Sequence, residues 1–201
     1  MKKLISLLLV LAMALSVLAG CGTTPAGDAD NGGAEVAAPA SALEVLENIW
    51  AQYGEDEMFP VIGGNMEAPV DGAPGNYDMA YVENLPFNLI VPHTELANVT
   101  EAATMVHMMN ANTFTAGVVK MADGTDMAAF ADTMADALKN NQWMCGMPEH
   151  MIIADMGGNY MLIAFGVNDA MGPFEAHLAE AYAGVTPIYS ESTKHYKHCH
   201  L

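Results

Sequence analysis

The sequence contains no arginine, so lysine supplies its only strongly basic side chains. The 201 residues hold 6 lysines against 24 Asp and Glu, and the formal net charge is −18. A chain this acidic repels phosphate groups and anionic lipid headgroups. We therefore expect no nucleic-acid partner, and we interpret the acidic side chains as a solvated, repulsive surface.

Cysteine is scarce as well, with only Cys21, Cys145 and Cys199 in the chain. The sequence has no paired C-x-x-C zinc spacing, no glycine-rich phosphate loop and no G-x-S-x-G nucleophile elbow. Because no catalytic or ligand motif in it is specific, the sequence predicts a location and a fold more readily than an activity.

The first 21 residues have the pattern of a secretion signal. Lys2 and Lys3 precede an apolar run from Leu4 to Leu18. This run is about 15 residues long, shorter than the roughly 20 that span a bilayer as a helix. It leads into Leu-Ala-Gly-Cys, ending at Cys21, which resembles the lipobox of bacterial lipoproteins.

This resemblance implies that residues 1–20 are removed as a signal peptide. The thiol of Cys21 would receive a diacylglyceryl group, and the new amine would be acylated. Two or three acyl chains anchor a protein stably, where one chain binds only marginally. We therefore expect a lipid-anchored protein on the outer face of the cell membrane, in a Gram-positive-type envelope.

The rest of the chain divides by composition. Residues 21–40 are the lipidated cysteine and a flexible tether, because Gly, Ala, Pro, Thr, Asp and Asn dominate there and cannot build a core. Residues 41–190 are expected to form a single α+β domain, and residues 191–201 a histidine-rich tail.

The core of that domain is expected at residues 114–189. Apolar, β-branched runs at 114–121, 150–156 and 160–166 predict strands, and Gly157-Gly158-Asn159 predicts a hairpin turn. Helical spacing predicts helices over 126–139 and 168–183, with Asp126 placed to cap the first and Asn168-Asp169 placed to cap the second. A last edge strand is expected at 185–189. The order β-α-β-β-α-(β) favours a small ferredoxin-like sheet, a split β-α-β, with its helices on one face.

The residues before this core are expected to form lead-in helices. Ser41 is placed to cap a helix, and a short helix is expected at 78–84. Residues 60–76, rich in glycine and proline, predict a loop. Residues 87–91 are ambiguous, and residues 98–109 favour a helix because Ala and Met are good helix formers.

Four short motifs lie within this domain: Met108-Met-Asn110, Val118-Val-Lys120 with Asp123-Gly124, Gln142-Trp143, and Gly158-Asn159-Tyr160. Together they resemble the C-terminal domain of small surface lipoproteins of Clostridia, over roughly residues 41–185. That family is described only as a domain of unknown function. The resemblance therefore implies a fold class and a location, and it carries over no functional residues.

The tail is the best candidate metal site. His195, His198, Cys199 and His200 offer imidazole and thiolate ligands that suit copper or zinc. Adjacent residues of an extended chain point in opposite directions, so the last three cannot converge on one ion without a turn. We therefore expect no cofactor, and keep a copper or zinc site as an alternative.

Other residues admit a chemical interpretation and a structural one. The sequence contains 17 methionines, among them Met105, Met108, Met109, Met144 and Met147. Their thioethers are soft metal ligands, but methionine is also a deformable side chain that fills cores. We favour a place in the core. Cys145 near Glu149 and His150 would give a nucleophile and a base. A buried thiol, or a disulfide between Cys145 and Cys199 outside the cell, needs no further residues. The lone histidines His93, His107 and His177 are expected to be hydrogen-bonded or exposed.

Three functions remain open from the sequence. The first is a non-catalytic lipoprotein that presents an α+β domain to a ligand or protein partner. The second is a copper- or zinc-binding lipoprotein that uses the tail. The third is an extracellular cysteine-dependent enzyme. We favour the first because it requires no residue that the sequence lacks.

The lipid anchor gives a direct test. We expect Cys21→Ser to abolish acylation, because the acyl chains need that thiol, and to move the protein from the detergent phase to the aqueous phase in a detergent partition. Unchanged partitioning into the detergent phase would contradict the lipoprotein interpretation.

Overall fold

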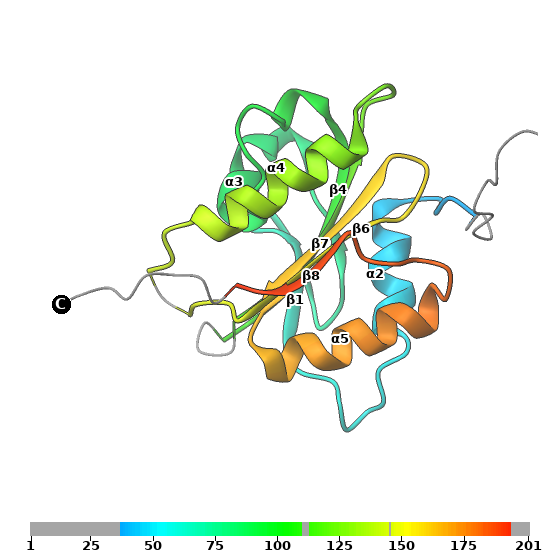
Figure 1. Ribbon diagram of the computed structural model, residues 1–201. Coiled ribbons are helices and arrows are strands. Elements are labelled where there is room, and N and C mark those ends of the chain that lie inside the picture. Colours follow the sequence, from blue (N-terminus) through cyan, green and yellow to red (C-terminus); the bar gives the residue numbers. More distant parts are fainter. Residues whose placement is uncertain (1–36, 110–112, 145, 194–201) are drawn as a thin grey trace, which may run out of the picture. The chain divides into compact units, whose positions relative to one another are not determined.

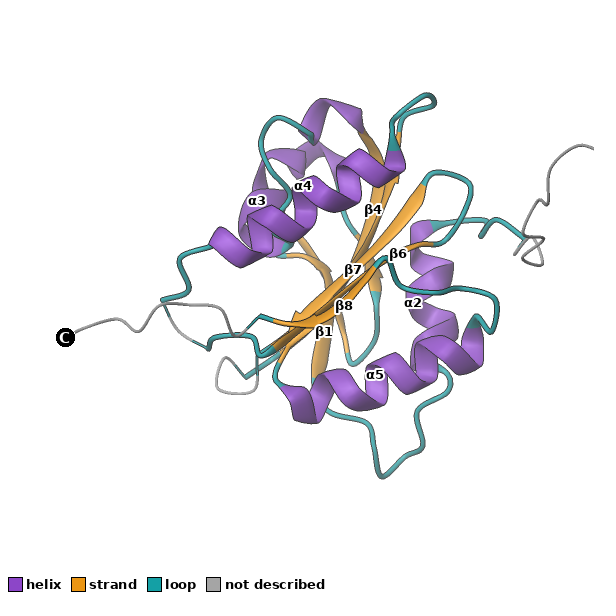
Figure 2. Cartoon of the chain, in the orientation of Figure 1, coloured by secondary structure: helices purple, strands orange, loops and turns teal. Residues whose placement is uncertain are grey.

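The computed structural model describes residues 37–109, 113–144 and 146–193, which all belong to one unit of the chain, residues 33–201. Its centre is one antiparallel sheet with helices on both sides (Figures 1 and 2). The strands are β1 (Val61–Asn65), β2 (Ala68–Asp71), β3 (Gly75–Asn76), β4 (Val99–His107), β5 (Phe114–Met121), β6 (His150–Asp155), β7 (Tyr160–Gly166) and β8 (Tyr189–Ser192). The helices are α2 (Ala42–Trp50), α3 (Leu85–Asn88), α4 (Met127–Asn140) and α5 (Asn168–Ala181), with 3₁₀ turns η1 (Met79–Asn84) and η2 (Leu96–Asn98).

Two helices begin where their capping residues predict. The Ser41 hydroxyl accepts a hydrogen bond from the Glu44 amide at 3.0 Å, at the start of α2. The Asp126 carboxylate accepts one from the Ala129 amide at 3.0 Å, at the start of α4. Both caps satisfy backbone donors that a helix leaves free in its first turn. Among the described residues no helix has the length and apolar character needed to cross a membrane.

The start of α5 differs from the expectation. Neither Asn168 nor Asp169 caps it, since its first residue is Asn168 itself. The carboxylate of Glu149, the residue before β6, accepts a hydrogen bond from the Asn168 amide at 3.1 Å. A distant side chain thus performs the task that the local sequence was expected to perform.

The expectation that the helices lie on one face of the sheet is wrong. Helices α2 and α5 cover one face, where Phe174 of α5 packs with Phe114 and other side chains of that face (Figure 1). Helix α4 covers the opposite face, where Phe130 packs in a second cluster with Val119. β5 and β7 are buried along almost their whole length, so both of their faces require cover.

The ferredoxin-like arrangement is not confirmed, whereas the α+β class is. The strand order is β2-β1-β4-β5-β7-β6-β8, with β3 paired to β4. Strands β5 and β6 both run antiparallel to β7, which lies between them, and α4 connects them. The last strand β8 pairs with β6 and not with β5, because β4 already occupies the other edge of β5.

The predicted loop at 60–76 is wrong, because it contains three short strands. Strand β1 pairs with β2 and β4, and β3 also pairs with β4. Glycines allow this close approach: a Cβ at Gly63 would lie 2.2 Å from the amide nitrogen of Gly75. The glycines interpreted as loop formers therefore let two backbone segments meet.

The predicted helix at 98–109 is also wrong. These residues form β4, which pairs with β5 along its length. Strand pairing and burial on both faces overrode the helical preference of Ala and Met. At the other end of the domain, β8 runs to Ser192, beyond the expected boundary at 190, and Thr193 is 2% exposed.

The close approach at Gly63 can be tested by substitution. We expect Gly63→Ala to lower the free energy of unfolding by about 3 kcal/mol or more, because the added methyl meets backbone that cannot move aside. The control is Gly54→Ala, where the nearest atom to the added Cβ is a side-chain oxygen of Glu57 at 3.5 Å. Denaturant unfolding measures both, and equal midpoints would show that the strands of 61–76 do not form.

Candidate functional site

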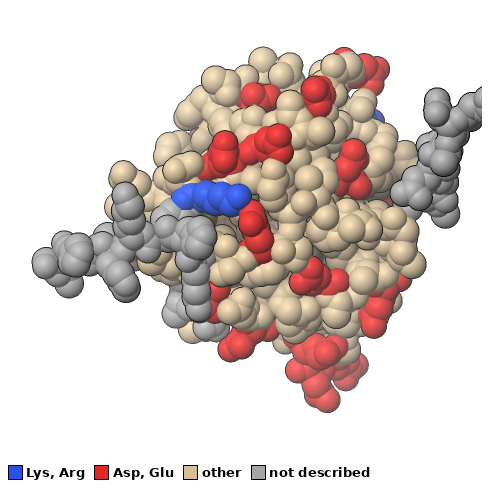
Figure 3. All heavy atoms as spheres, in the orientation of Figure 1, with Lys and Arg blue, Asp and Glu red and all other residues tan. Residues whose placement is uncertain are grey.

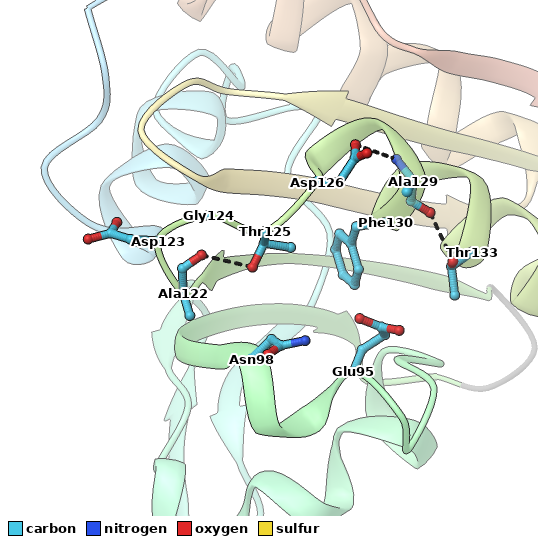
Figure 4. Close-up of a pocket in the computed structure, with 10 residues that line it drawn as sticks. All are labelled: Glu95, Asn98, Ala122, Asp123, Gly124, Thr125, Asp126, Ala129, Phe130 and Thr133. Atoms are coloured by element: carbon cyan, nitrogen blue, oxygen red, sulfur yellow. Dashed lines mark hydrogen bonds between the residues drawn. The ribbon is translucent and has the colours of Figure 1, made fainter.

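One hollow of the described domain lies at the turn from β5 to α4 and is acidic (Figure 4). It measures about 370 Å³ and includes Glu95, Asp123 and Asp126. Its polar groups serve the turn: the Thr125 hydroxyl donates to the Ala122 carbonyl at 2.8 Å, and Asp126 caps α4. Asp123 accepts a hydrogen bond from the Asn159 amide group at 2.9 Å. No group of three or more His, Cys, Asp or Glu among the described residues is arranged to hold a metal ion.

A second hollow lies at one end of the sheet and is lined mainly by apolar residues, with Asn88, His107, Thr113 and Thr115 as its polar members. It measures about 130 Å³. Val106, Thr115 and Phe165 form its floor, as a row of directly paired residues across β4, β5 and β7. One side is formed by Phe87 to Ile90, and the other by Trp143 and Gly146. We call this hollow the apolar groove.

Side chains around the apolar groove are exposed although they are large and apolar. Phe87 is 80% exposed and Met144 is 94% exposed. Phe87 and Met109 line the groove, and Met108, Met144 and Met147 are sequence neighbours of residues that line it. We call these five exposed apolar side chains the rim.

The rim corrects the interpretation of the methionines. Met105 is fully buried, as the core interpretation requires. The four rim methionines are between 53% and 94% exposed and contribute to no described core cluster. Their sequence neighbours offered the signal, because they adjoin turn residues such as Asn110 and Pro148 and fall outside the regular apolar stripes.

The groove is a neutral region on an acidic domain. None of the described residues that line it is Asp, Glu or Lys. Acidic side chains are dispersed over the face drawn in Figure 3. The two lysines of the described residues have partners: Lys139 pairs with Glu191 at 2.7 Å, and Lys120 lies 4.8 Å from the centre of the Tyr160 ring. The groove therefore suits an uncharged apolar group.

Trp143 lines the groove, and its ring packs against Phe165 with 5.3 Å between ring centres. Its indole nitrogen is buried and has no hydrogen-bond acceptor among the described residues. A buried N–H without an acceptor lowers the stability of the fold at this position.

The wall formed by α3 is held by a tyrosine. The Tyr77 hydroxyl donates to the side-chain oxygen of Asn88 at 2.9 Å. Burial raises the pKa of Tyr77 to about 12, and the nearby charges of Glu67 and Glu83 contribute to the increase. The hydroxyl therefore stays protonated and keeps donating to Asn88 at any physiological pH.

His107 lines the groove and holds the backbone of the rim at Met109. Its ring stacks on Phe59 at 5.2 Å, and its Nδ1 accepts a hydrogen bond from the Met109 amide at 2.9 Å. Burial lowers the pKa of His107. The neutral ring with Nδ1 as acceptor fixes the backbone at Met109, so this histidine acts on the position of the rim.

The other two lone histidines are not brought to the groove. His93 is exposed. His177 is buried, with Nδ1 2.9 Å from Glu180 and Nε2 3.4 Å from Glu57. Because the two carboxylates lie on different nitrogens, they do not converge on one point as metal ligands would.

The residues proposed as a base and its partner are used elsewhere. His150 Nε2 lies 3.2 Å from the Ser190 hydroxyl and 3.7 Å from a Glu175 oxygen. The same ring nitrogen thus faces both groups, whereas a catalytic triad places the hydroxyl and the carboxylate on different nitrogens. Glu149 accepts the Asn168 amide. Cys145 lies outside the described residues, as does its expected disulfide with Cys199.

The tail residues His195, His198, Cys199 and His200 also lie outside the described residues. The last described residue, Thr193, shows where the chain continues toward them. Its amide donates to the Glu149 carbonyl at 3.0 Å, and its hydroxyl donates to the Pro148 carbonyl. These carbonyls follow directly on Met147 of the rim, so the chain leaves the domain at the groove end of the sheet.

The N-terminal segment joins the domain at the opposite end of the sheet. The Tyr160 hydroxyl, at the start of β7, donates to the Ala40 carbonyl at 3.2 Å. Glu101 accepts the Ala42 amide at 2.6 Å. The groove lies at the other end of β7, which is about 20 Å away for a strand of this length.

Comparison with protein-family models, with curated proteins and with solved structures finds no match for this chain. The resemblance to the Clostridia lipoprotein domain therefore stays a prediction.

The lowered pKa of His107 predicts a pH dependence of stability. The unfolded chain takes up a proton near pH 6.5, whereas the folded ring resists it, so stability that is present above that pH is lost as the pH falls through the folded pKa. We expect His107→Asn, whose side-chain oxygen can still accept the Met109 amide, to lose less stability than the wild type between pH 7.5 and about 5. If the free energy of unfolding of the wild type and of His107→Asn changed with pH in parallel, the pKa of His107 would be the same in the folded and the unfolded chain.

Proposed function

We propose that this chain is a lipid-anchored, extracytoplasmic lipoprotein whose α+β domain binds a protein partner, without catalysis, through the apolar groove. The observation that carries the proposal is the rim. Two exposed apolar side chains, Phe87 and Met109, line a groove that has no Asp, Glu or Lys among its described lining residues, and three exposed methionines adjoin lining residues in the sequence. Exposed apolar clusters of this kind mark interaction sites in proteins.

The dimensions favour a protein segment over a small molecule. The groove measures about 130 Å³, below the roughly 300–1,000 Å³ of pockets that enclose a drug-sized ligand. It has room for one apolar side chain or ring, and the rim would extend the contact around it. Methionine side chains are flexible and polarisable, so a rim of this composition can adapt to more than one apolar sequence.

The position of the groove is consistent with an anchored protein. The tether joins the domain beside Tyr160, and the groove lies at the other end of the same strand. A domain held to a membrane through residues 21–40 would thus carry its binding surface on the end away from its attachment. A partner in the envelope or outside the cell could reach it there.

A second candidate, copper binding, is favoured by one observation. The rim places four exposed thioethers at the end of the sheet where Thr193 leads into the tail. Thioether, imidazole and thiolate ligands together suit Cu(I). Competition with the Cu(I) chelator bathocuproine separates the two candidates, since only the metal-binding protein would withhold copper, and would lose that ability on removal of residues 194–201.

The apolar groove can be tested with an uncharged apolar fluorophore, N-phenyl-1-naphthylamine. We expect the full-length protein to enhance its emission and each of Phe87→Ser and Met109→Ser to weaken that binding several-fold, because both variants remove apolar surface at the groove. Neither side chain is part of the core, so the fold should remain intact. Fluorescence titration provides the measurement.

The matched control is Met66→Ser. Met66 is 89% exposed, like the rim residues, but it lies in the turn between β1 and β2, outside the apolar groove. Any dye bound by the acyl chains is common to all variants. Equal loss in Met66→Ser, or no loss in the two groove variants, would remove the apolar groove as the binding surface.

A further inference from the structure

The chain leaves the described domain beside the apolar groove, with eight residues still to follow. Thr193 is 2% exposed and is held by Pro148 and Glu149, which fixes the starting point of the tail. The preceding residues Trp143 and Gly146 form one side of the groove. The tail therefore begins close to the apolar groove.

The tail is long enough to cross that surface. From β8 the path passes β6 and β7 to reach β5, three strand spacings or about 14 Å. Eight extended residues span at most about 26–29 Å. The tail can therefore reach Thr115 and Phe87 without any change in the domain.

The tail also has the charge that the domain lacks. Of the 24 Asp and Glu, all but Asp28, Asp30 and Glu35 lie among the described residues. The tail contributes Lys194 and Lys197, half of the lysines that follow the signal peptide. An acidic domain attracts a basic segment joined to it, at an effective concentration in the millimolar range for a short link.

The tail carries apolar groups as well. Tyr196 and Leu201 could fill a groove that has room for one apolar side chain. Length, starting point and apolar content thus agree on the same occupant, and charge attraction keeps the tail close to the domain.

We propose that residues 194–201 fold back over the apolar groove and occupy it in the unbound protein. A partner must then displace the tail, and only this second part of the proposal rests on the proposed function. Tail docking within one chain shields the rim from water and from other copies of the protein.

Disulfide trapping tests the position of the tail. The full chain carries Cys21→Ser and Cys145→Ser, so that Cys199 is its only native thiol, and Phe87→Cys adds a thiol at the rim. Diamide is the oxidant, with chelators present so that no metal bridges the thiols. We expect a disulfide within one chain between the introduced thiol and Cys199, forming several-fold faster than in 1 M NaCl, where screening removes the attraction.

The matched control places the second thiol at Ala176, in the same background. Ala176 is exposed on α5, which covers the opposite face of the sheet. We expect its disulfide with Cys199 to form several-fold more slowly than the one at Phe87→Cys. Equal rates at the two positions, or no intramolecular product at Phe87→Cys, would overturn the proposal. A product that forms only between chains would assign the groove to a second copy and would overturn it as well.

Dye binding separates this inference from the proposed function. If the tail covers a binding groove, removal of residues 194–201 should strengthen binding of N-phenyl-1-naphthylamine several-fold. Fast disulfide formation in the Phe87→Cys variant, without dye binding in either form, would retain the docked tail and reject the groove as a binding surface. Dye binding that depends on Phe87, without the disulfide, would do the opposite.

Discussion

The structure depends on the burial of two central strands on both faces. β5 and β7 pair along their length, and all seven residues of β7 are buried. An apolar strand of this kind is stable only when both of its faces are removed from water. The chain therefore needs a helical layer on each side, which α2 and α5 provide on one face and α4 with α3 on the other.

The helical cover on the second face is shorter than the sheet, and the apolar groove lies where that cover ends. Helix α4 stops at Asn140, and α3 contains only four residues. The row of Val106, Thr115 and Phe165 lies at the remaining gap. Phe87 and Met109 line this gap. The acidic groups lie elsewhere, so the groove is a neutral region of the domain.

The two ends of the sheet have different roles. At one end Tyr160 and Glu101 hold Ala40 and Ala42, at the start of the domain. At the other end Glu149, the residue before β6, contacts two further elements. Its carboxylate accepts a hydrogen bond from the first residue of α5, and its carbonyl accepts one from Thr193 after β8. The groove, the rim and the start of the tail therefore form one region whose geometry is fixed from both faces of the sheet.

The sequence by itself determined the features that depend on a few neighbouring residues. The caps at Ser41 and Asp126 are local hydrogen bonds. The β6–β7 hairpin follows from Gly157, Gly158 and Asn159, all of which adopt positive φ. Each of these features is decided within about four residues, so each can be read from the chain alone.

Only the tertiary structure decided the features that depend on distant partners. Gly63 became part of a strand because Gly75 packs against it, and residues 99–107 became a strand because β5 pairs with them. The groove needs Phe87, Met109 and Trp143 in one place, although they are far apart in the chain. Local sequence preferences do not predict contacts between distant residues, because those contacts depend on the pairing register of the strands and on which face of the sheet each helix covers.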